Sequence, residues 1–156
     1  MPRVLPLLGV VALAGCGGGG DDRLTKREYE QRVLEIRERF EPEALSLYGD
    51  LVVDDPLLPP AECVEKAHEL HRVLGEIVAE IEGLRSPQQV DHLQERFLVE
   101  ARKSVDAVGK LAQDVENGDV SCGQPFNGAA YGLESTKRAE RVLEEFRERG
   151  YRFGFE

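Results

Sequence analysis

The chain has 156 residues, of which 41% are apolar, so it can form one domain with a real hydrophobic core but is short for a multi-domain enzyme. Its 20 Lys and Arg stand against 30 Asp and Glu, which gives a formal net charge of −10. This acidic balance argues against nucleic-acid binding, because affinity for phosphates depends on Lys and Arg that displace counterions.

The N-terminus has the organisation of an export signal. Arg3 supplies a positive start, and residues 4–13 form an apolar run without a charge. A helix needs roughly 20 such residues to cross about 30 Å of hydrocarbon, so this run is too short to span a membrane. Its length is that of the central region of a secretory signal peptide.

The apolar run ends in Leu13-Ala14-Gly15-Cys16, which is the lipobox consensus, and the N-terminus resembles that of a bacterial lipoprotein precursor. The resemblance implies that Cys16 receives a diacylglyceryl thioether and becomes the mature N-terminus after cleavage behind Gly15. Two or more acyl chains, palmitate among them, are enough for stable membrane anchoring. The resemblance therefore implies export and lipid anchoring to the outer face of the cell membrane or of another envelope membrane. It covers residues 1–16 and implies no activity.

The next segment, Gly17 to Asp22, has no apolar residue to bury and is expected to be a flexible spacer. We therefore predict a cleaved signal peptide over residues 1–15, a lipidated Gly-rich tether over 16–23, and one helical domain over 24–156. Cleavage removes Arg3 and no acid, so the mature chain lacks a polybasic patch and the lipid alone would hold it at the membrane.

The first predicted helix has a clear start. Thr25 and Glu28 have the spacing of a capping box, and Leu24 and Tyr29 occupy the positions of a hydrophobic staple. Pro42 falls on the side opposite the apolar stripe, where we expect a kink rather than an end. At about 100° per residue, the positions that share the apolar face are Tyr29, Val33, Ile36, Phe40, Ala44, Leu47 and Leu51.

Gly49-Asp50 is expected to end this helix and to lead into a long connection, Leu51 to Pro60, which is rich in Pro yet carries apolar side chains. A polar linker would not need them, so we expect the connection to cover one end of the bundle. The second helix is predicted from Pro60 to about Leu84. Its inward positions are Cys63, Ala67, Leu70, Leu74, Ile77, Val78 and Ile81.

Ser86-Pro87-Gln88-Gln89 has the pattern of a helix start, with a Ser cap, a Pro in the first turn and a Gln three residues beyond the cap. The third helix is predicted from Pro87 to about Glu116, where Asn117-Gly118 is a stop signal. Its inward positions are Val90, Leu93, Phe97, Ala101, Ser104, Val108, Leu111 and Val115.

The last helix is predicted to begin at Asn127-Gly128 and to end before Gly150, with a weaker stripe of Tyr131, Ala139, Val142, Leu143 and Phe146. Together the segments predict an all-α fold, a four-helix antiparallel bundle with a long first connection and a short aromatic C-terminal tail. Exposed aromatic side chains are costly, so the tail, Tyr151 to Phe155, is expected either to seal a groove of its own bundle or to bind a partner.

The candidate metal ligands are His residues. Glu65-Lys66-Ala67-His68 has the Glu-x-x-His spacing of di-iron bundles, and His71 follows three residues later. Helical phase nevertheless puts Glu65 and His68 on the solvent side, and His92 points away from its own stripe. No second motif completes a ligand set, so we expect no metal site and no cofactor.

The sequence also lacks a nucleophile motif. None of its Ser residues lies in a Gly-x-Ser-x-Gly elbow, and Ser86 is explained as a helix cap and Ser104 as a small residue at a helix contact. Residues 17–20 follow no strand and lack the Lys of a phosphate-binding loop. We therefore expect no catalytic residues and a protein that is not an enzyme.

Cys63 and Cys122 are predicted to form a disulfide. Once Cys16 carries the lipid, an exported chain with three Cys keeps an even pair, which an oxidising compartment favours. Cys63 lies in the first turn of the second helix and Cys122 just beyond the third, and these ends meet in an antiparallel hairpin. Because the third helix is longer by about 12 Å of rise, residues 117–121 must turn back along it. The alternative is two free buried thiols.

Two functions fit these features. The first is a non-enzymatic, membrane-anchored helical module that binds another protein, of unknown identity, or helps to maintain the envelope. The second is a small-ligand or metal-binding lipoprotein that uses His68 and His71 or a pocket beneath residues 51–60. A packed interior would favour the first function, whereas a wide apolar cavity with a few polar groups would favour the second.

We predict that the native protein is acylated at Cys16 and lacks residues 1–15, because the complete signal pattern ends at this Cys. Intact-mass measurement of the membrane fraction should give the cleaved chain plus a lipid increment. A Cys16→Ser variant should keep its leader and carry no lipid, since only a thiol accepts the diacylglyceryl group. An unmodified chain from Met1 to Glu156 in native cells would refute the prediction.

Overall fold

The computed structural model describes residues 22–54, 58–131 and 133–154, so the predicted signal peptide, Cys16 and Phe155 lie outside the described residues. Within these ranges the chain forms helices and no strand, which confirms the all-α class. The elements are α1 (Lys26–Val52), α2 (Pro60–Glu82), the short 3₁₀ helix η1 (Gln88–Val90), α3 (Asp91–Glu116), α4 (Gln124–Tyr131) and α5 (Glu134–Glu148).

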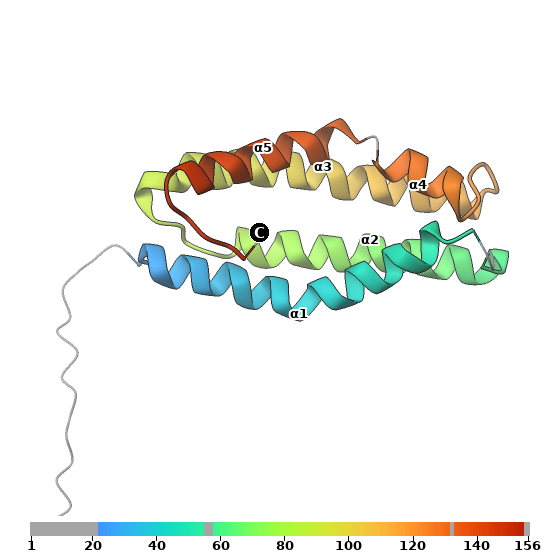
Figure 1. Ribbon diagram of the computed structural model, residues 1–156, viewed down its shortest axis with the longest axis horizontal. Helices are drawn as coiled ribbons and strands as arrows, with labels where there is room; N and C mark the ends of the chain where they lie inside the picture. The colour runs from blue at the N-terminus through green and yellow to red at the C-terminus, as the bar shows by residue number, and fades with distance from the viewer. Residues whose placement is uncertain (1–21, 55–57, 132, 155–156) are drawn as a thin grey trace, which may run out of the picture.

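The helices form two adjacent groups. α1 and α2 lie side by side, and α3 lies beside α4 and α5, which follow each other along its length (Figure 1). α2 links the two groups because it packs against both α1 and α3, while α4 contacts α1 as well as α3. None of the helices in the described ranges combines the length and the apolar character needed to cross a membrane.

α1 starts as the sequence predicts. Thr25 Oγ1 accepts a hydrogen bond from the backbone N of Glu28 (3.3 Å), and the Glu28 carboxylate accepts one from the backbone N of Thr25 (2.9 Å). The helix passes the exposed Pro42 without ending, and it bends along its length (Figure 1). The predicted end at Gly49-Asp50 is wrong, because the helix continues to Val52. The extra turn includes Leu51, which is fully buried.

The predicted inward faces of α1, α2 and α3 are largely confirmed, but the faces of α2 and α3 are wider than predicted. Val73 in α2 is completely buried, and so is Ala112 in α3, although neither belongs to the predicted stripes. Leu98 and Gln94 of α3 are buried as well. Each of these two helices packs against more than one neighbour, so a single line of apolar positions underestimates its buried surface.

The start of α3 differs from the prediction. Ser86 is buried, and its hydroxyl donates to the carboxylate of Asp91 instead of capping a backbone N–H. Neither η1 nor α3 has a side-chain cap. A carboxylate accepts a stronger hydrogen bond than a neutral group does, so it competes successfully for the hydroxyl. Residues 88–90 consequently form η1, and α3 begins only at Asp91.

The single last helix predicted from Asn127-Gly128 is wrong, because two helices, α4 and α5, occupy this part of the chain. α4 begins earlier, at Gln124, whose backbone N donates to Asp54 Oδ1 (2.8 Å). Asn127 lies inside α4, and its side chain accepts a hydrogen bond from the Tyr48 hydroxyl (2.8 Å). The start of α4 is thus fixed by a carboxylate 70 positions away, which no local pattern can reveal.

Cys63 and Cys122 lie at disulfide distance, with 2.05 Å between the Sγ atoms and 6.1 Å between the Cα atoms. Both are buried in a cluster that includes Phe126. After α3 the chain folds back, with the backbone N of Asp119 donating to the carbonyl oxygen of Asp114 (2.8 Å). This turn accommodates the greater length of α3 and brings Cys122 level with the start of α2.

The described part of the aromatic tail docks on its own bundle. Tyr151 and Phe153, each 5% exposed, pack against Tyr29 of α1 and Phe146 of α5. The ring centroid of Phe153 lies 5.3 Å from that of Phe146 and 5.8 Å from that of Tyr29. Burial raises the pKa of the Tyr29 hydroxyl well above its usual value. Arg37 donates to the carbonyl oxygen of Phe153 (3.3 Å), which fixes the tail to α1.

We predict that Cys63→Ala/Cys122→Ala lowers the free energy of unfolding by about 4 kcal/mol, because the bridge closes a long loop, with a sequence separation of 59. Urea unfolding under non-reducing conditions measures the loss. The wild-type chain treated with a thiol reductant is the matched control and should resemble the double variant. Equal stability of the variant and the untreated wild type would contradict the prediction.

Candidate functional site

An apolar hollow of about 370 Å³, here called the central hollow, lies in the middle of the bundle and is lined from all the α-helices. Its volume falls in the range of small-molecule sites, about 300–1,000 Å³. None of the described residues that line it is charged. The larger side chains of its wall are Leu45, Tyr48, Leu70, Leu74, Ile77, Val78, Phe97, Val105, Val108, Phe126 and Leu133.

The central hollow lies between the two ends of α1, although Ile36 and Phe40 of this helix still pack in one cluster with Val73 of α2 and Leu98 of α3. At one end α1 reaches α5 through the rings of Tyr29 and Phe146, and at the other it reaches α4 through Tyr48 and Asn127. Pro42 lies between these contacts, and Figure 1 shows the middle of α1 bowed outward. Small side chains face the space, namely Ala44, Ala101, Ser104, Ala130, Thr136 and Ala139.

Besides the Tyr48 hydroxyl, the polar groups of the central hollow belong to a hydroxyl cluster formed by Ser104, Ser135 and Thr136. Ser104 Oγ lies 3.1 Å from the carbonyl oxygen of Glu100, 2.9 Å from Ser135 Oγ and 3.3 Å from Thr136 Oγ1. Ser104 and Thr136 line the hollow, whereas Ser135 is buried behind them. The hollow therefore combines an apolar wall with a few fixed hydroxyl groups.

The charged groups beside the hydroxyl cluster are paired outside the hollow. The Glu100 carboxylate binds Lys103 (2.8 Å) and Arg138 (2.8 Å). Hydrogen bonds from Lys103 and then from Arg138 hold the pKa of Glu100 below its usual value. Glu100 is therefore ionised and engaged with its two cations at neutral pH, so it supplies no proton to the hydroxyl cluster.

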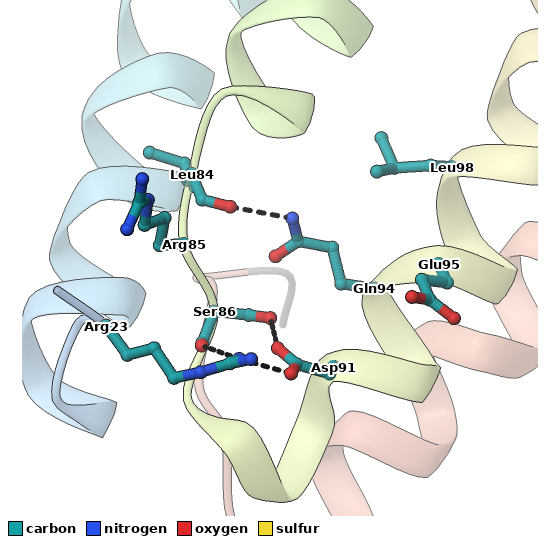
Figure 2. A pocket seen from close by; sticks show the side chains of 8 residues that line it. All are labelled: Arg23, Leu84, Arg85, Ser86, Asp91, Gln94, Glu95 and Leu98. Atoms are coloured by element: carbon teal, nitrogen blue, oxygen red, sulfur yellow. Dashed lines mark hydrogen bonds and ion pairs between the residues drawn. The ribbon is translucent and has the colours of Figure 1, made fainter. Parts of the chain in front are cut away.

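A second hollow, of about 360 Å³, lies where the chain before α1 meets the connection between α2 and α3 (Figure 2). The Ser86 hydroxyl and the Arg23 guanidinium both bind the Asp91 carboxylate, and Arg23 also donates to the carbonyl oxygen of Ser86 (3.2 Å). The Ser86 hydroxyl, and after it Arg23, hold the pKa of Asp91 below its usual value, although partial burial opposes them.

Gln94 completes this second region. Its Nε2 donates to the carbonyl oxygen of Leu84 (2.9 Å), just beyond α2 (Figure 2). It also donates to the carbonyl oxygen of Ile81 (3.3 Å), in the last turn of α2. Its Oε1 is buried without a hydrogen-bond partner among the described residues. Such a group costs about 1–3 kcal/mol, and the two bonds from Nε2 offset that cost. We interpret the second hollow as a structural junction, because Arg23 and Asp91 bind each other across it and Arg85 binds Asp22.

The structure separates the candidate metal ligands. His68 Nε2 lies 3.1 Å from Glu116 Oε2, on side chains that are both exposed. His71 packs against Gly109, and His92 is exposed beside Arg149. No group of three or more His, Cys, Asp or Glu is placed to hold a metal ion in the described part of the chain.

The first connection covers packed side chains. Leu51 is fully buried, and Leu58 packs against the cluster that holds Cys63 and Cys122. Val53, by contrast, is exposed, and Leu57 lies outside the described residues. The apolar hollow described above lies in the middle of the bundle, whereas residues 55–57 of this connection lie outside the described residues, so the pocket expected beneath residues 51–60 stays a prediction.

No protein-family model, curated protein or solved structure gives a significant match to this chain. Sequence reasoning missed Tyr48, Ser135 and Thr136 as groups at or beside a cavity. The only local signal was the presence of hydroxyl side chains on or next to apolar helix faces. Such side chains are also common in helices that do not border a cavity.

We predict that Asp91→Asn makes stability less sensitive to acid. The pKa of Asp91 is lowered in the folded state, so its contribution is complete above the ordinary aspartate pKa of about 3.9 and is lost as the pH falls through the lower folded pKa. Unfolding measured from about pH 5 to about pH 2 should show a steeper loss for the wild type than for the variant. Asp106→Asn, at an exposed position of the same helix, is the control and should follow the wild type.

Proposed function

We propose that the protein is an exported, lipid-anchored binding protein that holds a small apolar molecule in the central hollow. The observation that carries this proposal is the uncharged lining of a 370 Å³ hollow in the middle of the bundle. Removing apolar surface from water contributes about 25 cal/mol per Å², so an apolar molecule gains most where the surrounding wall is apolar too. Of the two functions considered from the sequence, this geometry favours ligand binding.

Binding is favoured over catalysis by the chemistry of the polar groups. Ser and Thr hydroxyls become nucleophiles only when a general base takes their proton. The described residues that line the central hollow include Ser104 and Thr136 but no His, Asp, Glu or Lys. We therefore assign these hydroxyls to ligand recognition and propose no reaction.

The proposed anchor is the acylated Cys16, joined by the Gly-rich segment to a bundle whose described residues begin at Asp22. The same proposal treats α4 and α5 as one interrupted element, so that the fold counts as a four-helix antiparallel bundle. The arrangement of α4 and α5 in line beside α3 supports this description (Figure 1). Anchoring would keep the central hollow outside the cytoplasm and close to a membrane surface.

A protein partner remains the second candidate, and one observation favours it. Leu45 lines the central hollow, yet it is 63% exposed, which is high for a large apolar side chain. An amphipathic helix of a partner could place one apolar side chain against Leu45 and into the hollow. Such a partner would compete with a small apolar ligand for the same wall.

We predict that Ala44→Leu/Ala101→Leu abolishes ligand binding without unfolding the protein. Both Ala side chains face the central hollow, so larger ones fill it. Cavity filling commonly stabilises proteins by about 0.5–2 kcal/mol, so thermal stability should stay equal or rise. The measurement is the fluorescence of the neutral dye Nile red with the chain that begins at residue 16 and carries Cys16→Ser, because attached acyl chains would compete.

The matched control is Ala79→Leu, at an exposed position of α2, which should bind the dye like the parent chain. Equal dye binding by Ala44→Leu/Ala101→Leu and by the parent would refute the proposed site. Absence of dye binding to the folded parent would refute the ligand-binding function itself.

A further inference from the structure

The hydroxyls that line the central hollow have already committed their protons. Tyr48 donates its hydroxyl proton to Asn127 Oδ1 (2.8 Å). A phenol has one proton, so the remaining capacity of the Tyr48 oxygen is to accept a hydrogen bond. At this point the wall of the hollow offers lone pairs and no donor.

The hydroxyl cluster leads to the same result. Ser104 has one proton and finds two acceptors inside the protein, the carbonyl oxygen of Glu100 (3.1 Å) and Ser135 Oγ (2.9 Å). Ser104 Oγ and Thr136 Oγ1 lie 3.3 Å apart and either atom could donate, but with the Ser104 proton engaged elsewhere we assign Thr136 as the donor. Thr136 then retains only lone pairs toward the hollow that it lines.

The charge of the protein also disfavours an anionic ligand. The chain carries a formal net charge of −10, and no described residue that lines the hollow is a cation. The cations close in sequence to the hydroxyl cluster are paired: Lys103 and Arg138 bind Glu100, and Lys137 binds Glu134. An anionic ligand, such as a carboxylate or a phosphate, would therefore bury its charge against acceptor atoms and be repelled by the negative protein. A neutral ligand would avoid both the desolvation of a charge and this repulsion.

We propose that the ligand of the central hollow is a neutral molecule with an apolar body and one hydrogen-bond donor, a hydroxyl or an N–H, which donates to Tyr48 Oη or Thr136 Oγ1. This inference rests on the proposed function and specifies its ligand class. The apolar body supplies the affinity by covering the wall. The donor supplies the selectivity, because a ligand with a hydroxyl or an N–H gains a hydrogen bond to the Tyr48 or Thr136 oxygen that an apolar ligand without a donor lacks.

The test compares three probes with the same apolar chain: decanol, decyl methyl ether and decanoate. Each displaces Nile red from the chain that begins at residue 16 and carries Cys16→Ser. Decanol should bind about three- to tenfold tighter than the ether, the ratio expected for one net hydrogen bond. Decanoate should bind more weakly than the ether, because it adds a charge and no donor.

Two variants test whether the preference for decanol over the ether comes from Tyr48 and Thr136. Tyr48→Phe/Thr136→Val removes both acceptors while keeping the shape of the wall, so the ratio of decanol to ether affinity should fall to about one. An unchanged affinity for the ether shows that the hollow of the variant is intact. Tyr151→Phe, in the aromatic cluster at the end of the bundle, is the control and should keep the wild-type ratio.

The outcomes separate this inference from the function on which it rests. Equal binding of decanol and the ether to the parent chain would overturn the donor inference and leave an apolar binding protein. Tighter binding of decanoate than of decanol would also overturn it. Failure of Nile red and of all three probes to bind the folded parent would refute the proposed function, and the inference with it.

Discussion

α1 is held to the opposite side of the bundle at its two ends, and the central hollow depends on this constraint. The aromatic cluster of Tyr29, Phe146, Tyr151 and Phe153 closes one end, and the contact from Tyr48 to Asn127 closes the other. Pro42 lies between them and lets the helix bow outward while both contacts persist.

Most of the fold follows from local patterns, because helices are stabilised by residues close in the sequence. The capping box at Thr25, the stop at Asn117 and the apolar stripes can all be recognised in the sequence alone. The errors have a different cause. Ser86 binds Asp91, and Asp54 fixes the start of α4, so in both places a side chain outside the expected pattern decides where a helix begins.

The candidate site was less predictable than the fold. The pairing of Cys63 with Cys122 could be expected from cysteine parity and from the ends of two antiparallel helices. The central hollow could not be expected from the sequence, because a cavity depends on how the side chains of several helices pack against one another. Ala101 and Ser104 fit an ordinary close helix contact on sequence grounds, and only the position of α1 turns them into part of a cavity wall.

The free-energy cost of an empty cavity limits how the central hollow can be occupied. A sealed and unfilled cavity of about 370 Å³ would cost about 9 kcal/mol at about 24 cal/mol per Å³. That is most of the stability of a typical domain, about 5–15 kcal/mol. Water offers little relief against an uncharged wall, because a buried water needs several polar partners. Leu45 of the wall is 63% exposed, so the hollow is open to solvent and only part of this cost applies; an apolar occupant would remove that part by covering the wall. The strongest restraints, the Cys63–Cys122 pair and the aromatic cluster, lie at the ends of the bundle, so an occupant can enter the middle without breaking either.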